Sequence, residues 1–183
     1  MEANVVINPV YYPYLKDERR LQIYYGGSSS GKSFFLCQRI ILDLLEGKRN
    51  YLVIRNVMAT IRLSTFNELT KAILAMNVQN YFNINMSNLT ITCKLNNKQI
   101  MFYGCDQIEK VKSITPKDGV LTDIFIEEAT EVDYNSYKQL RKRLRGRSDV
   151  PKRVTMAFNP ILKTHWIYEE FFEKVWRDDE TRY

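Results

Sequence analysis

Apolar and polar positions along this chain form two alternating patterns, and their order predicts the fold. Short, nearly continuous apolar runs are typical of strands buried on both faces, and they occupy residues 21–25, 51–54, 123–126 and 153–158. Helical spacing of apolar residues occurs over about 31–46, 64–76, 134–145 and 164–176. Strands that alternate with helices in this way predict an α/β fold, with a mainly parallel sheet and helices on both faces.

Residues 81–103 have a different pattern, in which apolar and polar residues alternate. Two tight-turn signals, Ser87-Asn88 and Asn96-Asn97, divide this segment into three parts. We therefore expect an antiparallel meander of three strands near 81–103, followed by a short helix over 108–114. Residues 1–20 contain Asn8-Pro9 and Tyr12-Pro13, which predict an irregular lead-in to the first strand.

A phosphate-binding motif lies between the first predicted strand and the first predicted helix. It fits the pattern G-x-x-x-x-G-K-[ST] and consists of Gly26, Gly27, Ser28, Ser29, Ser30, Gly31, Lys32 and Ser33. Glycines let the backbone turn its N–H groups toward phosphate oxygens, and the helix start adds a positive dipole end. Lys32 is suited to the β- and γ-phosphates, and the Ser33 hydroxyl to Mg²⁺. The flanking strand and helix favour this interpretation over a chance Ser/Gly loop, so we expect binding of a nucleoside triphosphate with Mg²⁺.

Two adjacent carboxylates follow the strand predicted over 123–126. The sequence Ile124-Phe125-Ile126-Glu127-Glu128 places them at the carboxyl end of a strand, where ligands bind in α/β folds. Glu127 is then a candidate for holding Mg²⁺ and Glu128 for activating a water molecule. The simpler alternative is a pair of acids at a helix start. Asn159, after the next strand, is either a γ-phosphate sensor or a polar turn before Pro160.

The chain has a net charge of +6 over 183 residues, which is compatible with one domain and a polyanionic partner. A basic run contributes to this charge, with Lys138, Arg141, Lys142, Arg143, Arg145, Arg147, Lys152 and Arg153. It predicts a solvated helix face, contacts to DNA phosphates, or an arginine that stabilises transferred phosphate. The 3 cysteines contain no C-x-x-C pair and indicate reduced, intracellular thiols. No apolar run reaches membrane-spanning length, and His165, the single histidine, is expected to be structural.

Several segments in order resemble the ATPase domain of the large terminase subunit of tailed bacteriophages. Besides 25–33 and Glu127-Glu128, they are Val53-Ile54-Arg55 with Arg62 and Ser64, Phe102 to Asp106, Leu144 to Arg147, Phe158-Asn159-Pro160 and His165 to Tyr168. The resemblance covers about residues 20–170 and implies a P-loop NTPase of the RecA-like type. It also implies ATP hydrolysis that drives double-stranded DNA into a viral procapsid, in the cytoplasm of the bacterial host. The implied partners are the portal protein, a small terminase subunit and further copies of the chain in a ring.

The resemblance also assigns roles to residues. Lys32 and Ser33 match the residues that bind phosphate and Mg²⁺, Glu127 the Walker B carboxylate, Glu128 the catalytic glutamate, and Asn159 a motif that couples hydrolysis to movement.

Two residues of the predicted site depart from the family pattern. Glu127 stands where Asp is usual, and Ser28 where many members carry an arginine. The basic residue that completes a neighbouring site is then Lys112, Lys117 or Arg147. We find no acidic cluster of the kind that a C-terminal nuclease domain carries. We therefore expect residues 1–183 to be a single ATPase domain without nuclease activity, excised or a fragment, in which 170–183 begin a linker.

Other functions remain open on the sequence. Another RecA-like DNA motor or helicase shares the same core. A P-loop kinase with a lid at 141–147 has no clear use for Glu127-Glu128. A GTPase switch is disfavoured because Asn97-Lys98-Gln99-Ile100 lacks the acid of N-K-x-D. A DNA-binding module with a vestigial nucleotide site is the non-enzymatic alternative.

Overall fold

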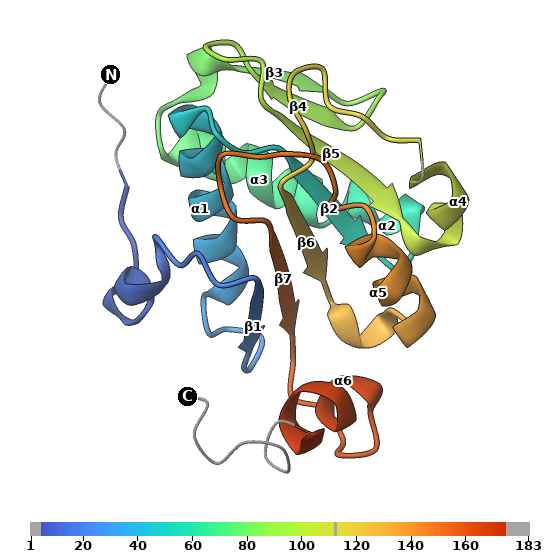
Figure 1. Cartoon of the computed structure of the whole chain (residues 1–183). Coiled ribbons are helices and arrows are strands. Elements are labelled where there is room, and N and C mark those ends of the chain that lie inside the picture. The colour runs from blue at the N-terminus through green and yellow to red at the C-terminus, as the bar shows by residue number, and fades with distance from the viewer. Residues whose placement is uncertain (1–4, 112, 175–183) are drawn as a thin grey trace.

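A single sheet of seven strands organises the molecule (Figure 1). The structure is a computed structural model and describes residues 5–111 and 113–174. From one edge of the sheet to the other, the strands are β1 (Leu21–Tyr25), β7 (Arg153–Phe158), β6 (Asp123–Glu127), β2 (Tyr51–Arg55), β5 (Gln99–Gly104), β4 (Thr90–Cys93) and β3 (Phe82–Asn85).

The first five strands in this order are parallel and the last two extend the sheet antiparallel. β1 pairs with β7, β7 with β6, β6 with β2 and β2 with β5, all in parallel. β4 then pairs antiparallel with both β5 and β3. The expected parallel sheet and the expected meander are thus both confirmed, and β5 is the strand that belongs to both.

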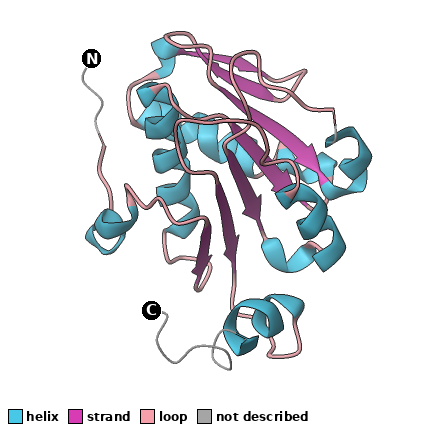
Figure 2. Cartoon of the chain, viewed as in Figure 1, coloured by secondary structure: helices cyan, strands magenta, loops and turns pink. Residues whose placement is uncertain are grey.

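Helices cover both faces of the sheet, as Figure 2 shows. On one face, α1 (Lys32–Glu46) packs beside α3 (Thr65–Ala75); on the other lie α4 (Ile108–Val111) and α5 (Tyr134–Arg141). Neighbouring residues of a strand point to opposite faces. Val53 and Phe125 therefore join the core under α1 and α3, whereas Leu52, Ile124 and Ile126 join the core under α5. This two-sided burial explains why the parallel strands are apolar throughout.

Some expectations about the helices were wrong. The lead-in is not wholly irregular, because Pro9–Tyr14 form a 3₁₀ helix that Asn8 caps through its side chain. The helix expected over 134–145 ends at Arg141, where the chain changes to tighter turns with hydrogen bonds from Arg143 N to Leu140 O and from Leu144 N to Arg141 O. A short helix, α2 (Met58–Ile61), was not expected.

Two predicted segments extend beyond the described residues or differ in their helical geometry. The short helix over 108–114 is observed as α4, which ends at Val111. In the tail, α6 (Trp166–Tyr168) continues as a π-helical turn over Glu169–Glu173, while positions 175–183 lie outside the described residues. No helix among residues 5–111 and 113–174 is both long and apolar enough to cross a membrane.

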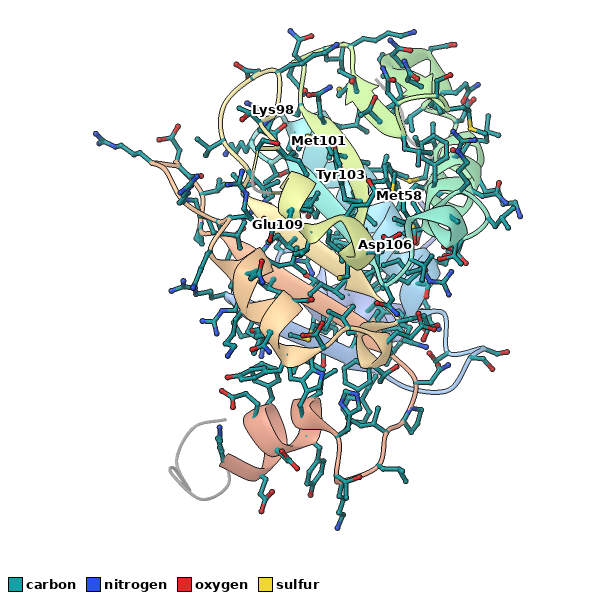
Figure 3. All side chains as sticks on the ribbon, turned by 90° about the vertical axis from the view of Figure 1, so that its right-hand side faces the viewer. Met58, Lys98, Met101, Tyr103, Asp106 and Glu109 are labelled. Carbon is teal, nitrogen blue, oxygen red and sulfur yellow. The ribbon has the colours of Figure 1, made fainter. Side chains whose placement is uncertain are left out.

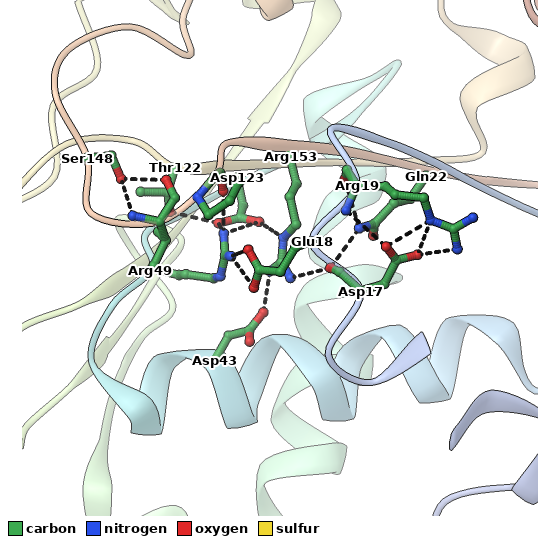
Figure 4. Close-up of polar contacts among 12 residues, drawn as sticks. Asp17, Glu18, Arg19, Gln22, Asp43, Arg49, Thr122, Asp123, Ser148 and Arg153 are labelled. Atoms are coloured by element: carbon green, nitrogen blue, oxygen red, sulfur yellow. Dashed lines mark hydrogen bonds and ion pairs between the residues drawn. The ribbon is translucent and has the colours of Figure 1, made fainter. Parts of the chain in front are cut away.

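A buried polar network ties the amino ends of the strands together (Figure 4). Arg153 and Asp123, at the starts of β7 and β6, are each only 1% exposed, and Arg153 Nε donates to Asp123 Oδ1 at 2.5 Å. Arg153 also donates to Asp43 of α1. Arg49 donates to Asp123 at 3.1 Å and to Glu18 of the lead-in at 2.6 Å. Ion pairs therefore stabilise the amino edge of the sheet. The candidate site lies on loops at the opposite, carboxyl edge.

Candidate functional site

The carboxyl ends of three adjacent strands bring the candidate residues to one edge of the sheet. Strand β7 lies between β1, which leads into the loop at 26–33, and β6, which leads into Glu127 and Glu128. The register sets Tyr25 opposite Phe158, and Glu127 opposite Ala157. Gly26 N donates to Phe158 O at 3.3 Å, so the loop starts beside Asn159. Residues separated by more than 100 positions thus meet at one site.

The loop at 26–33 leads into the start of α1, which no side chain caps. Gly31 is the N-cap of α1 at φ 80°, a left-handed conformation that glycine adopts without steric cost, and no side chain caps the helix. The first N–H groups of a helix have no partner within it, and the first turn of α1 contains no acidic residue. Gly27, Ser28, Ser29 and Ser30 are exposed, and Ser33 is half-buried. Unpaired donors at the positive end of a 15-residue helix fit an anion such as phosphate.

Lys32 is folded back over its own loop and is 7% exposed. Its Nζ donates to the carbonyl oxygens of Gly26 at 3.0 Å and Gly27 at 3.3 Å, and to Oδ1 of Asn159 at 3.0 Å. Asn159 itself is exposed at the end of β7. The ammonium group therefore lies between the loop and the neighbouring strand.

The Glu127 carboxylate is buried and faces the start of α3. It accepts a hydrogen bond from Thr65 Oγ1 and lies 4.0 Å from Arg55 Nε. Burial raises the pKa of Glu127, and the nearby Glu68 adds to this effect, whereas the hydrogen bond from Thr65 and the charge of Arg55 oppose it. One oxygen of Glu127 is thus held by Thr65, and the carboxylate has the donor chemistry that Mg²⁺ prefers.

Glu128 has an unusual backbone conformation, with φ 48° and ψ 51°. Left-handed conformations are rare for residues other than glycine and often mark functional positions. Glu128 is half-buried, and no described residue donates a hydrogen bond to its carboxylate. The backbone thus turns away from the extended conformation of β6 at Glu128, and the described residues leave both of its carboxylate oxygens unengaged.

Two neighbours of the site were missed by the sequence analysis. Arg55 and Thr65 both contact Glu127. The signal for Arg55 is its position at the end of β2, where Ile54 pairs with Ile126 of β6. Thr65 begins a helix, but only the fold shows that this helix starts beside β6.

Tyr11 of the lead-in is a third missed neighbour. Its hydroxyl donates to Ser30 O at 2.8 Å, and its ring stacks on Phe35 of α1 with a centroid distance of 4.6 Å. The lead-in therefore supports the phosphate-binding loop from outside the sheet.

The loop after β5 is held tightly against α2 at the same edge. Asp106 Oδ1 accepts a hydrogen bond from Met58 N at 3.1 Å, and Figure 3 labels both residues. A Cβ on Gly104 would lie 2.4 Å from Met58 N, which explains the glycine at this position.

Two of the three candidates for the basic residue that completes a neighbouring site, Lys117 and Arg147, lie away from this edge. Lys117 is exposed, and its backbone N–H donates to Gln99 Oε1 at 2.8 Å, near the amino end of β5. Arg147 is exposed in the connection between α5 and β7. Lys112 lies outside the described residues. Neither Lys117 nor Arg147 reaches the loop of its own chain, so the assignment stays a prediction.

Within residues 5–111 and 113–174, no group of three or more His, Cys, Asp and Glu side chains is arranged to hold a metal. The three cysteines are free thiols. His165 caps α6, with Nδ1 accepting from Ile167 N at 3.2 Å and Nε2 lying 3.0 Å from Thr130 O, which is a structural role.

Comparison with known proteins identifies the family. The family model described as phage terminase large subunit matches residues 18–183. The PBSX phage terminase large subunit of Bacillus subtilis (strain 168) is 34% identical over 167 residues, which are 91% of this chain and 37% of that protein. The terminase large subunit of Bacillus phage SPP1 is 28% identical over 151 residues, or 80% of this chain and 36% of that protein. This chain thus spans little more than a third of either relative.

Solved structures show the same fold. A large terminase from a thermophilic bacteriophage matches with a TM-score of 0.70 and 16% identity, over 89% of this chain and 39% of that one. The same terminase has been solved in complex with ATP-gamma-S, and that structure matches with a TM-score of 0.67. The family model covers nearly the whole sequence, and this chain belongs to the phage terminase large-subunit family.

Proposed function

We propose that this chain binds ATP with Mg²⁺ at residues 26–33 and hydrolyses it to drive the packaging of DNA. One observation carries the proposal: the uncapped start of α1 and the Lys32 ammonium lie beside the strands that end in Glu127-Glu128 and Asn159. An anion site next to two carboxylates is the arrangement that phosphoryl transfer to water requires.

Each residue of the site has a role that follows from its position. The N–H groups of residues 26–33 bind the phosphates, and Lys32 exchanges its contacts with Gly26, Gly27 and Asn159 for phosphate oxygens. Ser33 and Glu127 would hold Mg²⁺, which offsets charge on the β- and γ-phosphates. Glu128, with a carboxylate that is not engaged by described residues, orients the attacking water and takes its proton. Asn159 senses whether Lys32 is bound to phosphate.

The proposal for packaging rests on family membership and on the relatives. The ATP-gamma-S complex of the thermophilic phage terminase supports nucleotide binding by this fold. We propose double-stranded DNA, the portal protein and a small terminase subunit as partners, with several copies of the chain in a ring in the host cytoplasm. The basic candidates Lys117 and Arg147 lie away from the nucleotide site of their own chain. We therefore propose that one of them reaches the nucleotide site of a neighbouring copy in the ring. We further propose that residues 1–183 act as an ATPase domain and do not cleave DNA.

Glu128→Gln tests the hydrolytic role most directly. The variant should bind ATP with unchanged affinity, measured by calorimetry, while phosphate release with water as the sole acceptor falls about 100-fold or more, as expected when a catalytic base is lost. Glu131→Gln, which removes an exposed carboxylate from the next turn, is the matched control and should retain activity. Equal turnover in both variants would contradict the proposal. Formation of ADP and a phosphorylated acceptor, only when a second acceptor is added, would instead indicate a kinase.

A further inference from the structure

A cavity lies on the face of the sheet that α4 and α5 cover. It measures about 470 Å³, and its lining consists of Ile108, Val111, Gln139, Lys142, Arg143 and Arg145. None of these residues belongs to the loop at 26–33 or to the strand ends that form the nucleotide site. The cavity is therefore separate from the site proposed above.

The lining of this cavity is cationic. Lys142, Arg143 and Arg145 contribute three positive charges, and no carboxylate is among the lining residues that the structure describes. Glu109, which marks α4 in Figure 3, does not line it. Burial lowers the pKa of Arg143 and the charge of Arg145 lowers it further. Three positive charges thus surround one cavity, and a negative group bound there would offset their mutual repulsion.

Arg143 is anchored, yet it keeps an unused donor. Its Nη2 donates to Ile114 O at 2.8 Å, which fixes the guanidinium plane. Its Nε is buried and has no hydrogen-bond partner among the described residues, and the same is true of Gln139 Oε1. A buried N–H without a partner is uncommon in folded proteins. A flip of the Gln139 amide would present a second donor to the cavity.

Capping of α5 does not account for these cations. The carbonyl groups of Leu140 and Arg141 already accept backbone N–H groups from Arg143 at 2.9 Å and from Leu144 at 3.2 Å. Exposed Lys138, Arg141 and Arg147 extend the positive charge beyond the cavity, which favours a polyanion over a single carboxylate. An arginine fork flanked by further cations matches the geometry and charge of a phosphate.

We propose that this cavity binds a phosphate group, with the Arg143 fork as its centre and Lys142 and Arg145 beside it. The phosphate comes either from the backbone of duplex DNA or from free phosphate. The first source rests on the proposed packaging function, whereas the second does not.

The Nε–H signal of Arg143 in ¹H–¹⁵N spectra reports on the cavity directly. The signal is assigned by its loss in Arg143→Gln, and the wild-type protein is titrated separately with inorganic phosphate and with a short DNA duplex. A saturable shift with the duplex supports a backbone phosphate. A shift with inorganic phosphate alone supports a free-phosphate site. The absence of a shift with either probe would overturn the proposal.

A second variant guards against misfolding of Arg143→Gln, since that substitution also removes the contact to Ile114. Lys142→Gln changes an exposed side chain and should reduce the salt dependence of duplex binding, d log K/d log [salt], by about 1. Lys138→Gln removes the same charge one turn earlier, where Lys138 lies over the Tyr134 ring instead of lining the cavity, and the Arg143 signal should shift as in wild type. Equal losses of the Arg143 response in both variants would show a diffuse surface effect and refute a built site.

The ATPase measurement on Glu128→Gln is independent of these titrations. A protein that turns over ATP but shows no Arg143 response loses only this proposal. A protein that responds to phosphate at Arg143 but does not hydrolyse ATP loses only the proposed function.

Discussion

Lys32 Nζ and Asn159 Oδ1 lie 3.0 Å apart, although 127 positions separate the two residues in the chain. The two carbonyl oxygens of Gly26 and Gly27 accept from the same ammonium group, so its three hydrogens have three partners. A phosphate can engage Lys32 only by displacing some of them. Phosphate binding is therefore linked to the end of β7, which continues through Pro160 toward α6.

Substitutions of Asn159 test whether its contact with Lys32 competes with phosphate binding. Asn159→Asp places a carboxylate beside Lys32, which pairs with the ammonium and repels the phosphates. We expect its Kd for ATP to rise about tenfold or more, equivalent to ~1.4 kcal/mol. Asn159→Ala removes a competitor for Lys32 and should bind ATP at least as tightly as wild type. Calorimetric titration of both variants checks the order, and weaker binding by the alanine variant than by the aspartate variant would contradict it.

Thr65 should contribute to stability through Glu127. Thr65→Val keeps the shape of the side chain but removes the Thr65 hydroxyl that donates to the buried carboxylate, which costs about 1–3 kcal/mol of unfolding free energy. The loss also raises the pKa of Glu127 further, because the hydrogen bond from Thr65 lowers that pKa. Denaturant unfolding at neutral pH measures the difference.

Thr70→Val is the matched control within α3. Its hydroxyl donates to the carbonyl of Phe66 in the same helix, at 2.9 Å, and not to a buried carboxylate among the described residues, so we expect a change of less than about 0.5 kcal/mol. Equal losses of unfolding free energy in the two variants would show that the Thr65–Glu127 contact contributes no more to stability than the Thr70–Phe66 contact.

The spacing of apolar residues was sufficient to predict the sheet and most helices. A strand that is buried on both faces of a sheet has a continuous apolar run, which is easy to recognise in the sequence. The prediction of the end of α5 failed for a local reason. Leu144 continues the helical spacing, but the chain is already in tighter turns and Arg143 reaches out to Ile114. Spacing alone does not distinguish these two backbone geometries.

The candidate site was only partly predictable, since its motifs are local and its contacts are not. The loop at 26–33 and the pair Glu127-Glu128 stand out in the sequence. The contact of Arg55 with Glu127 depends on β2 lying next to β6. The order of strands in the sheet cannot be predicted from the sequence of either strand. The sequence predicts an irregular segment around Tyr11, and only the folded chain shows that its hydroxyl donates to Ser30 O.

Arg153 should be essential for stability at the amino edge of the sheet. Arg153→Met leaves the buried Asp123 with less compensation and removes the bond to Asp43, which costs about 3–5 kcal/mol when a buried pair is broken. Arg20→Met removes an exposed arginine next to β1 and should change the unfolding free energy by less than about 0.5 kcal/mol. Chemical denaturation compares the two, and a similar small loss in both would mean that the network is dispensable.

Asp133 should give α5 a pH-dependent stability. Its carboxylate accepts from Ser136 Oγ at 2.6 Å and from the backbone N–H groups of Asn135 at 2.9 Å and Ser136 at 3.0 Å. The Ser136 hydroxyl, followed by the backbone groups, lowers the pKa of Asp133 below its ordinary value of 3.8. A lowered folded-state pKa means that the stabilisation is fully present above pH 3.8 and is lost as the pH falls through the folded-state value.

Substitutions at Asp133 test both the cap and its charge. Asp133→Ala should lose about 1 kcal/mol of unfolding free energy at neutral pH, as is typical for a helix N-cap. Asp133→Asn keeps an acceptor for the backbone N–H groups, so its deficit relative to wild type should be smaller and should shrink further as the pH falls below 3.8. Urea unfolding at a series of pH values measures this dependence, with Asp149→Asn as an exposed control outside α5. A deficit of Asp133→Asn that stays constant across the acidic range would show that the Asp133 charge does not contribute to the cap.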